Sequence, residues 1–227
     1  MITLIFRCLG NFVVGAFVLQ TLSGCALLPR FARPAPIQLE VRIATEDRSA
    51  HYSRKEWMPD GHWLKRDGCR TTRSVVLQRD SRIPVSWTST GCSVDSGLWI
   101  SPYTGDSLRS ATELDIDHVV PLAEASRSGG SSWDSARKIA YANFLDDSTH
   151  LLSVDLASNR IKSDDDPPRW MPSSAEFTCA YLAAWTRVKA RWDLAMDSTE
   201  FVFVEHGLDS CDRAGALVPP VVLGTSP

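Results

Sequence analysis

Four polar residues of this chain have types and spacing that could do chemistry on a phosphate ester. Asp117 and His118 are adjacent inside an otherwise apolar segment, and Asn159 and Lys162 follow in a short polar stretch. An imidazole with a pKa near 6.5 can act as a general base close to neutral pH. Carboxylate and amide oxygens are ligands for a hard divalent cation, and a lysine can hold a phosphate group. Together they could supply what phosphodiester hydrolysis requires.

Each of these residues also has an ordinary structural interpretation. Asp117 and His118 alone would more often be an exposed pair on a surface hairpin, Asn159 a helix cap, and Lys162 a solvated charge. Adjacent residues on a strand point to opposite faces, so the chain must bend or bulge at 117–118 for both to serve one site. The combination favours a metal-and-base site over a surface hairpin.

The elements that must position these residues can be predicted from periodicity and capping signals. We expect Ser131 or Ser132 to cap the first of the predicted helices, and Pro167 to follow the second. Apolar residues recur at helical spacing in the first and third helices. The predicted elements are a strand over 114–121, a helix over 133–144, a short buried strand over 150–155, a short helix over 156–164, and the longest helix over 175–195.

The order of these blocks resembles the HNH, or ββα-metal, endonucleases. The nearest branch includes small exported bacterial proteins and the C-terminal nuclease domain of GmrSD-type restriction enzymes. The resemblance rests on Leu114–Ala125 (LDIDHVVPLAEA), on His150–Val154 (HLLSV), and on Ser158–Asp164 (SNRIKSD) leading to Pro168–Pro172 (PRWMP). Flanking segments extend it to roughly residues 50–212.

The resemblance implies an α+β fold with a ββα-metal core at about residues 113–166, added helices and a disulfide-stapled N-terminal extension. It implies a metal-dependent endonuclease in a domain over 51–212. We expect little sequence preference, because one small module with modest local charge can hold phosphates but offers no obvious element that reads bases. We expect a monomer that acts on nucleic acid, with DNA favoured over RNA. His118 would be the general base, Asp117 and Asn159 the ligands of Mg²⁺ or Mn²⁺, and Lys162 the phosphate contact.

His150 departs from the family pattern, in which most members carry Asn to brace the loop of the hairpin. Histidine also offers a donor and an acceptor, so the bracing role can survive. Alternatively, His150 reaches the metal and shifts the preference toward Zn²⁺ or Ni²⁺. Two other functions stay open: a catalytically decayed lipoprotein that binds nucleic acid or the cell envelope, and a structural envelope component whose Trp-rich first part binds a partner or glycan.

The N-terminal segment has the pattern of an export signal. Residues 1–24 hold one charge, Arg7, followed by an apolar run, which predicts a signal peptide. The Leu-Ser-Gly-Cys sequence ending at Cys25 resembles a bacterial lipobox, so we expect a lipid anchor there and a cell-envelope lipoprotein. The alternative is an ordinary secretory peptide. We expect residues 25–50 to be a tether and 213–227 a flexible tail.

The remaining cysteines fit an oxidising compartment. Four are left after Cys8 and Cys25: Cys69, Cys92, Cys179 and Cys211. An even number in an exported chain indicates two disulfides, for which three pairings are possible, and we expect the two local pairs. No Cys-x-x-Cys motif occurs, which argues against zinc held by thiolates.

The charge balance limits the kind of partner. Removing Arg7 with the signal leaves 23 basic and 27 acidic residues, a net charge of 23 − 27 = −4. This argues against a protein that coats nucleic acid, although basic residues gathered in the second half leave room for a local phosphate-binding patch. We expect residues 51–112 to be irregular with short strands or a helical turn, and their tryptophans to be mainly core.

Overall fold

The computed structural model describes residues 37–215 and 221–226. The predicted signal segment and Cys25 lie outside these residues. The strands are β1 (Ile37–Arg42), β2 (Lys65–Asp67), β3 (Arg70–Thr71), β4 (Ser86–Trp87), β5 (Val94–Ile100), β6 (Ser107–Ser110), β7 (Leu114–His118), β8 (Leu151–Asp155) and β9 (Val221–Ser226). The helices are α1 (Arg54–Trp57), α2 (Thr72–Asp80), α3 (Leu122–Arg127), α4 (Ser135–Ala142), α5 (Leu156–Lys162), α6 (Ala175–Trp192) and α7 (Ser198–Arg213), with 3₁₀ turns at 59–61, 111–113 and 130–132.

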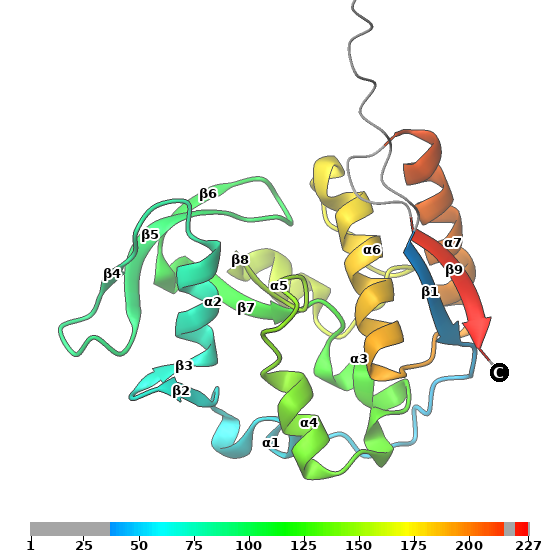
Figure 1. Ribbon diagram of the computed structural model, residues 1–227, viewed down its shortest axis with the longest axis horizontal. Helices are drawn as coiled ribbons and strands as arrows, with labels where there is room; N and C mark the ends of the chain where they lie inside the picture. The colour runs from blue at the N-terminus through cyan, green and yellow to red at the C-terminus, as the bar shows by residue number, and fades with distance from the viewer. Residues whose placement is uncertain (1–36, 216–220, 227) are drawn as a thin grey trace, which may run out of the picture. The chain divides into compact units, whose positions relative to one another are not determined.

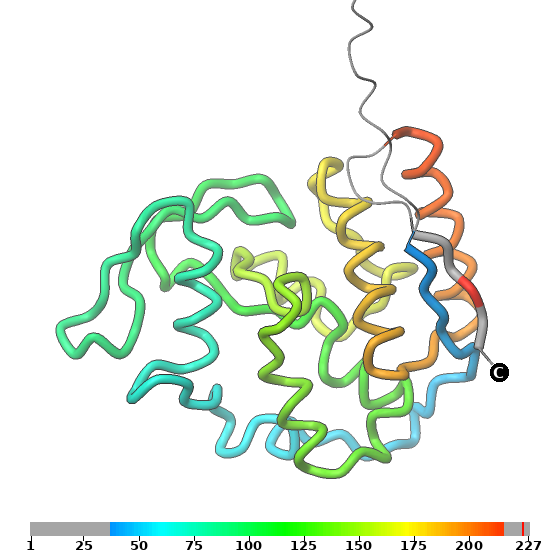
Figure 2. Tube along the Cα trace, viewed as in Figure 1, coloured from blue at the N-terminus to red at the C-terminus, as the bar shows by residue number. Residues whose placement is uncertain are grey.

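The described residues form a mixed α+β fold of small sheets and helices (Figure 1). β4, β5 and β6 make an antiparallel three-stranded sheet, and β2 pairs with β3. β7 and β8 pair antiparallel, from Leu114 opposite Asp155 to His118 opposite Leu151. The chain between β7 and β8 runs through α3 and α4, as Figure 2 shows.

The elements next to the predicted site and the longest helix lie where the sequence pattern placed them, within a few residues. β7, β8, α5 and α6 confirm the predicted strands and helices. α5 follows β8 without a break, because the Asp155 carboxylate caps its first turn by accepting a hydrogen bond from the Ser158 N–H at 2.8 Å. The helix ends at Ser163, where a φ of 51° turns the chain. α5 contacts both β7 and β8.

The cap of α4 differs from the prediction. Asp134 is the N-cap, and its carboxylate accepts a hydrogen bond from the Arg137 N–H at 2.8 Å. Ser131 and Ser132 lie instead in the preceding 3₁₀ turn. An ionised carboxylate is a stronger acceptor than a hydroxyl for the unpaired amides of a first helical turn, which explains why the helix begins after Asp134.

Parts of the predicted tether and tail are regular structure. Residues 37–42 form β1 and residues 221–226 form β9, and the two strands pair in parallel, from Ile37 opposite Val221 to Arg42 opposite Ser226. β1 also contacts α6, and β9 contacts α7 (Figure 1). Backbone pairing between two segments about 180 residues apart satisfies polar groups that neither could satisfy alone.

Two disulfides join described residues, and both are the predicted local pairs: Cys69 with Cys92, and Cys179 with Cys211. The first staples the segment that contains β2 to β5, and the second ties α6 to α7. Trp57 and Trp99 are 0% and 1% exposed, which confirms their prediction as core residues. One hydrophobic cluster surrounds α6 and α3, and a second lies between α2, β5 and the β7–β8 pair.

Candidate functional site

Three of the predicted site residues line one cleft. Asp117, His118 and Asn159 share a cavity of about 500 Å³ with Tyr52, which precedes α1, and with Arg54, the first residue of α1. β7 supplies the first two residues and α5 the third, so the junction of a strand pair and the following helix forms the wall. The cleft also reaches Pro121 and Leu122 at the start of α3, and Ser163 and Asp164 after α5.

The hydrogen bond of His118 fixes which ring nitrogen is basic. Its Nε2 lies 2.8 Å from the carbonyl oxygen of Ala142, at the end of α4. A carbonyl can only accept, so Nε2 carries the proton, and in the neutral ring Nδ1 holds the free electron pair. The imidazole stacks against Trp63, with planes 17° apart and centroids separated by 5.4 Å. Burial, followed by the neighbouring His150, lowers the pKa of His118 well below its usual value, so the ring is neutral at pH 7.

Asp117 is held by two other side chains. Lys162 Nζ donates to both carboxylate oxygens, at 3.0 and 2.8 Å, and the Tyr103 hydroxyl donates to Oδ2 at 2.5 Å. Asp117 is 5% exposed and Lys162 is fully buried. Burial raises the pKa of Asp117 and lowers that of Lys162, against the attraction between them. The geometry is that of a buried ion pair whose desolvation outweighs its mutual attraction.

The predicted phosphate contact at Lys162 needs correction. Its third donor bond goes to the carbonyl oxygen of His118 at 2.9 Å, so all three N–H groups of the ammonium are used. α5 packs directly on β7, which places the lysine one turn after Asn159 underneath the strand and away from solvent. Lys162 therefore positions Asp117 and the backbone of His118, and its ammonium is not available for a phosphate contact.

Asn159 bonds to a carboxylate that was not among the predicted site residues. Its Nδ2 donates to Asp115 Oδ2 at 3.0 Å. Asp115 and Asp117 are two residues apart on β7 and so lie on the same face of the strand. With Nδ2 used in this way, the side-chain carbonyl oxygen of Asn159 has no hydrogen-bond partner among the described residues, and the residue lines the cleft.

His150 lies behind the site. It is 1% exposed, and its Nε2 lies 2.8 Å from the carbonyl oxygen of Tyr141. Its own backbone carbonyl accepts from the Val119 N–H at 3.1 Å. The side chain thus ties the end of α4 to the start of β8. Burial lowers the pKa of His150 to about 4.

The donor set fits a hydrated hard cation. An ionised carboxylate offers about four lone-pair positions. Lys162 and Tyr103 use three of those on Asp117, so one remains on Oδ1, and Asn159 adds an amide oxygen. Mg²⁺ and Mn²⁺ suit such oxygen ligands and keep several waters. The preference for Zn²⁺ or Ni²⁺ was expected only if His150 bound the metal. His150 is buried and does not line the cleft, so the structure gives no support to that alternative.

Two side chains of this site were not predicted from the sequence: the basic Arg54 and the aromatic Tyr103. Arg54 is exposed, lines the cleft, and is close enough to lower the pKa of His118 through its charge. Tyr103 belongs to the loop between β5 and β6. Arg54 is remote in sequence from the Asp-His pair, and Tyr103 lies in an irregular loop before it. No local pattern in the chain distinguishes either one from surface or core residues.

Comparison with known proteins shows one clear relationship. No protein-family model and no solved structure matches the chain. A protein of Arthroderma benhamiae described as an uncharacterized secreted protein is 36% identical over 151 residues, which span 66% of this chain and 72% of the fungal one. Within the described residues, no helix has the length and apolar character that crossing a membrane requires. This chain belongs to the same protein family as the secreted fungal protein.

Proposed function

We propose that this protein is a metal-dependent endonuclease that hydrolyses phosphodiester bonds of DNA with little sequence preference. The observation that carries the proposal is the orientation of His118. Its Nε2–H is tied to the Ala142 carbonyl, which leaves Nδ1 as the base on the wall of a cleft that also contains Asp117 and Asn159. The ββα-metal interpretation of β7, β8 and α5 belongs to this proposal.

Each residue of the cleft has a separate role in the proposed hydrolysis. Nδ1 of His118 accepts a proton from water as the water oxygen attacks phosphorus and the bond to the 3′ oxygen breaks. The Ala142 carbonyl accepts from the imidazole throughout and stabilises its charged form. A divalent cation held by Asp117 and Asn159 would supply positive charge to the phosphate and to the leaving oxygen.

Arg54 replaces Lys162 as the proposed phosphate contact. Its guanidinium is always charged and offers paired donors that match phosphate oxygens. It is exposed and lines the cleft that His118 faces, whereas Lys162 is fully buried. Contacts of this kind bind the backbone and carry no sequence information, which supports low specificity.

Export is part of the same proposal. The two disulfides of the described residues are of a kind that persists in oxidising compartments, and the fungal relative is described as secreted. We infer that the chain is exported and anchored through lipid on Cys25. Metabolic labelling with a radioactive fatty acid tests the anchor: the label should appear on the protein and be lost in Cys25→Ala.

The activity is tested with supercoiled plasmid incubated with the purified protein. Nicking is expected with Mg²⁺ or Mn²⁺ and none with EDTA. Arg54→Ala should lower the cleavage rate by about tenfold or more and weaken DNA binding. Arg109→Ala is the matched control, because Arg109 is an exposed arginine on β6 that does not line the cleft.

A binding protein without activity would give a different set of results. Intact plasmid under Mg²⁺, Mn²⁺, Zn²⁺ and Ni²⁺ alike, with DNA retarded in a gel shift that depends on Arg54, would favour the binding lipoprotein. A defined cleavage sequence would contradict the low specificity proposed here.

A further inference from the structure

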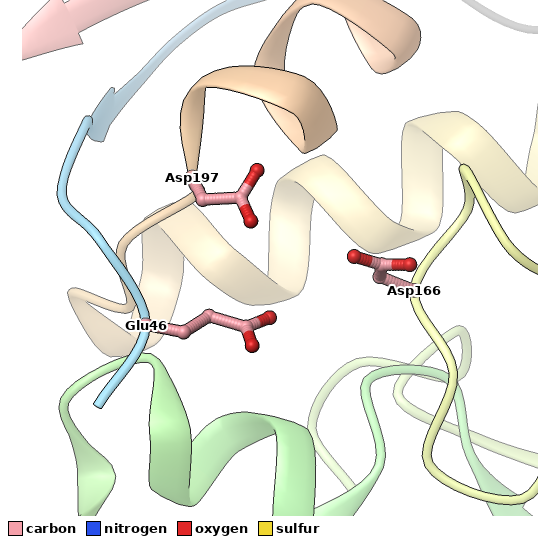
Figure 3. Close-up of side chains that lie close together, drawn as sticks. All are labelled: Glu46, Asp166 and Asp197. Carbon is pink, nitrogen blue, oxygen red and sulfur yellow. The ribbon is translucent and has the colours of Figure 1, made fainter. Parts of the chain in front are cut away.

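Three carboxylates outside the cleft converge from segments far apart in the chain. They belong to Glu46, between β1 and α1, to Asp166, in the loop after α5, and to Asp197, which precedes α7 (Figure 3). One oxygen of each lies within 4.8 Å of one oxygen of the other two. In Figure 3 the carboxylates of Glu46 and Asp166 point toward each other across the space beneath Asp197.

Asp166 has a buried carboxylate oxygen to which no hydrogen-bond donor is directed among the described residues. The residue is 3% exposed, and its Oδ1 has no hydrogen-bond partner among the described residues. The nearest basic group, Arg169 Nε, is 3.9 Å away, which is too long for a hydrogen bond. A buried carboxylate oxygen without a donor is costly, and a proton, an ordered water or a bound cation can offset that cost.

The other two carboxylates keep oxygens available. Oε2 of Glu46 lies 2.8 Å from Arg48 and 3.4 Å from Arg127, while Oε1 is buried and has no hydrogen-bond partner among the residues described. Oδ1 of Asp197 accepts from the first amides of α7, at 2.8 and 2.9 Å, which leaves Oδ2. Each of the three residues can therefore direct one oxygen at a shared ion.

The charges around the site do not cancel. The ion pairs and close electrostatic neighbours of the three residues form one network in the described part of the chain. It contains six carboxylates (Glu46, Glu124, Asp164, Asp166, Asp197 and Glu200) and four basic groups (Arg48, Arg127, Arg169 and Lys189). Carboxylates therefore outnumber basic groups around the site.

The type and origin of the ligands favour one kind of cation. Carboxylate oxygens suit hard cations such as Ca²⁺ and Mg²⁺. Ca²⁺ accepts oxygen ligands in a flexible geometry, whereas Mg²⁺ demands a near-ideal octahedron, so carboxylates on side chains from three separate segments suit Ca²⁺ better.

We propose that Glu46, Asp166 and Asp197 bind one Ca²⁺ ion, which fastens the segment after β1 and the loop after α5 to the start of α7. The site is separate from the proposed nuclease centre, since none of its ligands lines the cleft. With three carboxylates and few other ligands, the expected Kd lies in about the 10⁻⁴–10⁻³ M range of extracellular calcium sites.

The test is calcium titration of the purified protein after removal of metals with EDTA. Calorimetry should give one Ca²⁺ per chain, and Ca²⁺ at about a hundred times Kd should raise Tm by about 5–10 °C. Mg²⁺ at the same concentration should raise it far less. Asp166→Asn and Asp197→Asn should each weaken Ca²⁺ binding by about tenfold or more. Asn at 197 still caps a helix, so that variant keeps α7 intact.

Two controls separate this site from others. Asp209→Asn removes an exposed charge from α7, and Asn159→Ala alters the cleft; both variants should keep the full response to Ca²⁺. Without Ca²⁺, Asp166→Asn should unfold at a higher temperature than the wild type, because it removes one of three carboxylates that repel one another. An unchanged Tm of the wild type in 10 mM Ca²⁺ would overturn the proposal, as would an equal response of both site variants and the wild type.

Discussion

Replacing Lys162 by Met tests the most unexpected contact of the site. Methionine keeps the buried stem and removes the ammonium, which donates three hydrogen bonds, two to Asp117 and one to the His118 carbonyl. The carboxylate then stays buried with only Tyr103 as a donor. Removing one partner of a buried ion pair costs about 3–5 kcal/mol, so the free energy of unfolding should fall by that amount at pH 7.

The loss should depend on pH in a defined direction. Burial already raises the pKa of Asp117, and removal of the lysine raises it further. Between the unfolded pKa, about 3.9, and the folded pKa, the folded state holds more protons than the unfolded state. Stability therefore falls as pH rises through this interval. The variant should recover part of its loss near pH 4, where Asp117 becomes neutral.

Urea denaturation at pH 4, 5.5 and 7 measures the effect. With m of about 2–3 kcal/mol/M, the midpoint at pH 7 should drop by about 1–2 M urea. Lys138→Met is the matched control, because Lys138 pairs with Glu56, whose side chain is 41% exposed. Its midpoint should change far less, because the Glu56 carboxylate left without its partner is solvated, whereas Asp117 is buried. Equal losses in both variants, or a Lys162→Met loss that grows on acidification, would refute the buried-pair interpretation.

Three further changes have expected outcomes. Tyr103→Phe removes one hydrogen bond from the buried carboxylate and should lower the free energy of unfolding by about 1.5–3 kcal/mol in urea denaturation; no change would contradict the contact. Cys179→Ser with Cys211→Ser opens a loop with a sequence separation of 32 and should cost about 3–4 kcal/mol, and a Tm equal to wild type would exclude that contribution. Asn159→Ala should raise the Mg²⁺ concentration for half-maximal plasmid nicking by at least tenfold, and an unchanged concentration would remove Asn159 from the proposed ligands.

Local patterns were sufficient to predict the scaffold of the site. β8 and α5 follow from a short apolar run that passes into a polar helix capped by Asp155, and α6 follows from its 3.6-residue stripe. The two disulfides join cysteines that are near in sequence. In each case the physical cause acts over about 30 residues or fewer, so it can be found in the sequence.

The features that were not predicted depend on packing between distant segments. A lysine in a polar stretch is ordinarily solvated, and only the docking of α5 on β7 buries Lys162 beside Asp117. Arg54 lies on α1, more than 60 residues before the Asp-His pair, and only the folding of the chain brings it to the cleft. The pairing of β1 with β9 joins the two ends of the described chain, and neither segment carries a signal of its partner.

The most direct test of the proposed nuclease is the rate of plasmid nicking by His118→Ala. The variant is compared with the wild type at one Mg²⁺ concentration, after circular dichroism has shown that both are folded. Loss of a general base should lower the rate by about 10²–10⁴-fold, while DNA binding persists. A variant that nicks DNA as fast as the wild type would contradict the central role given to the free Nδ1 of His118.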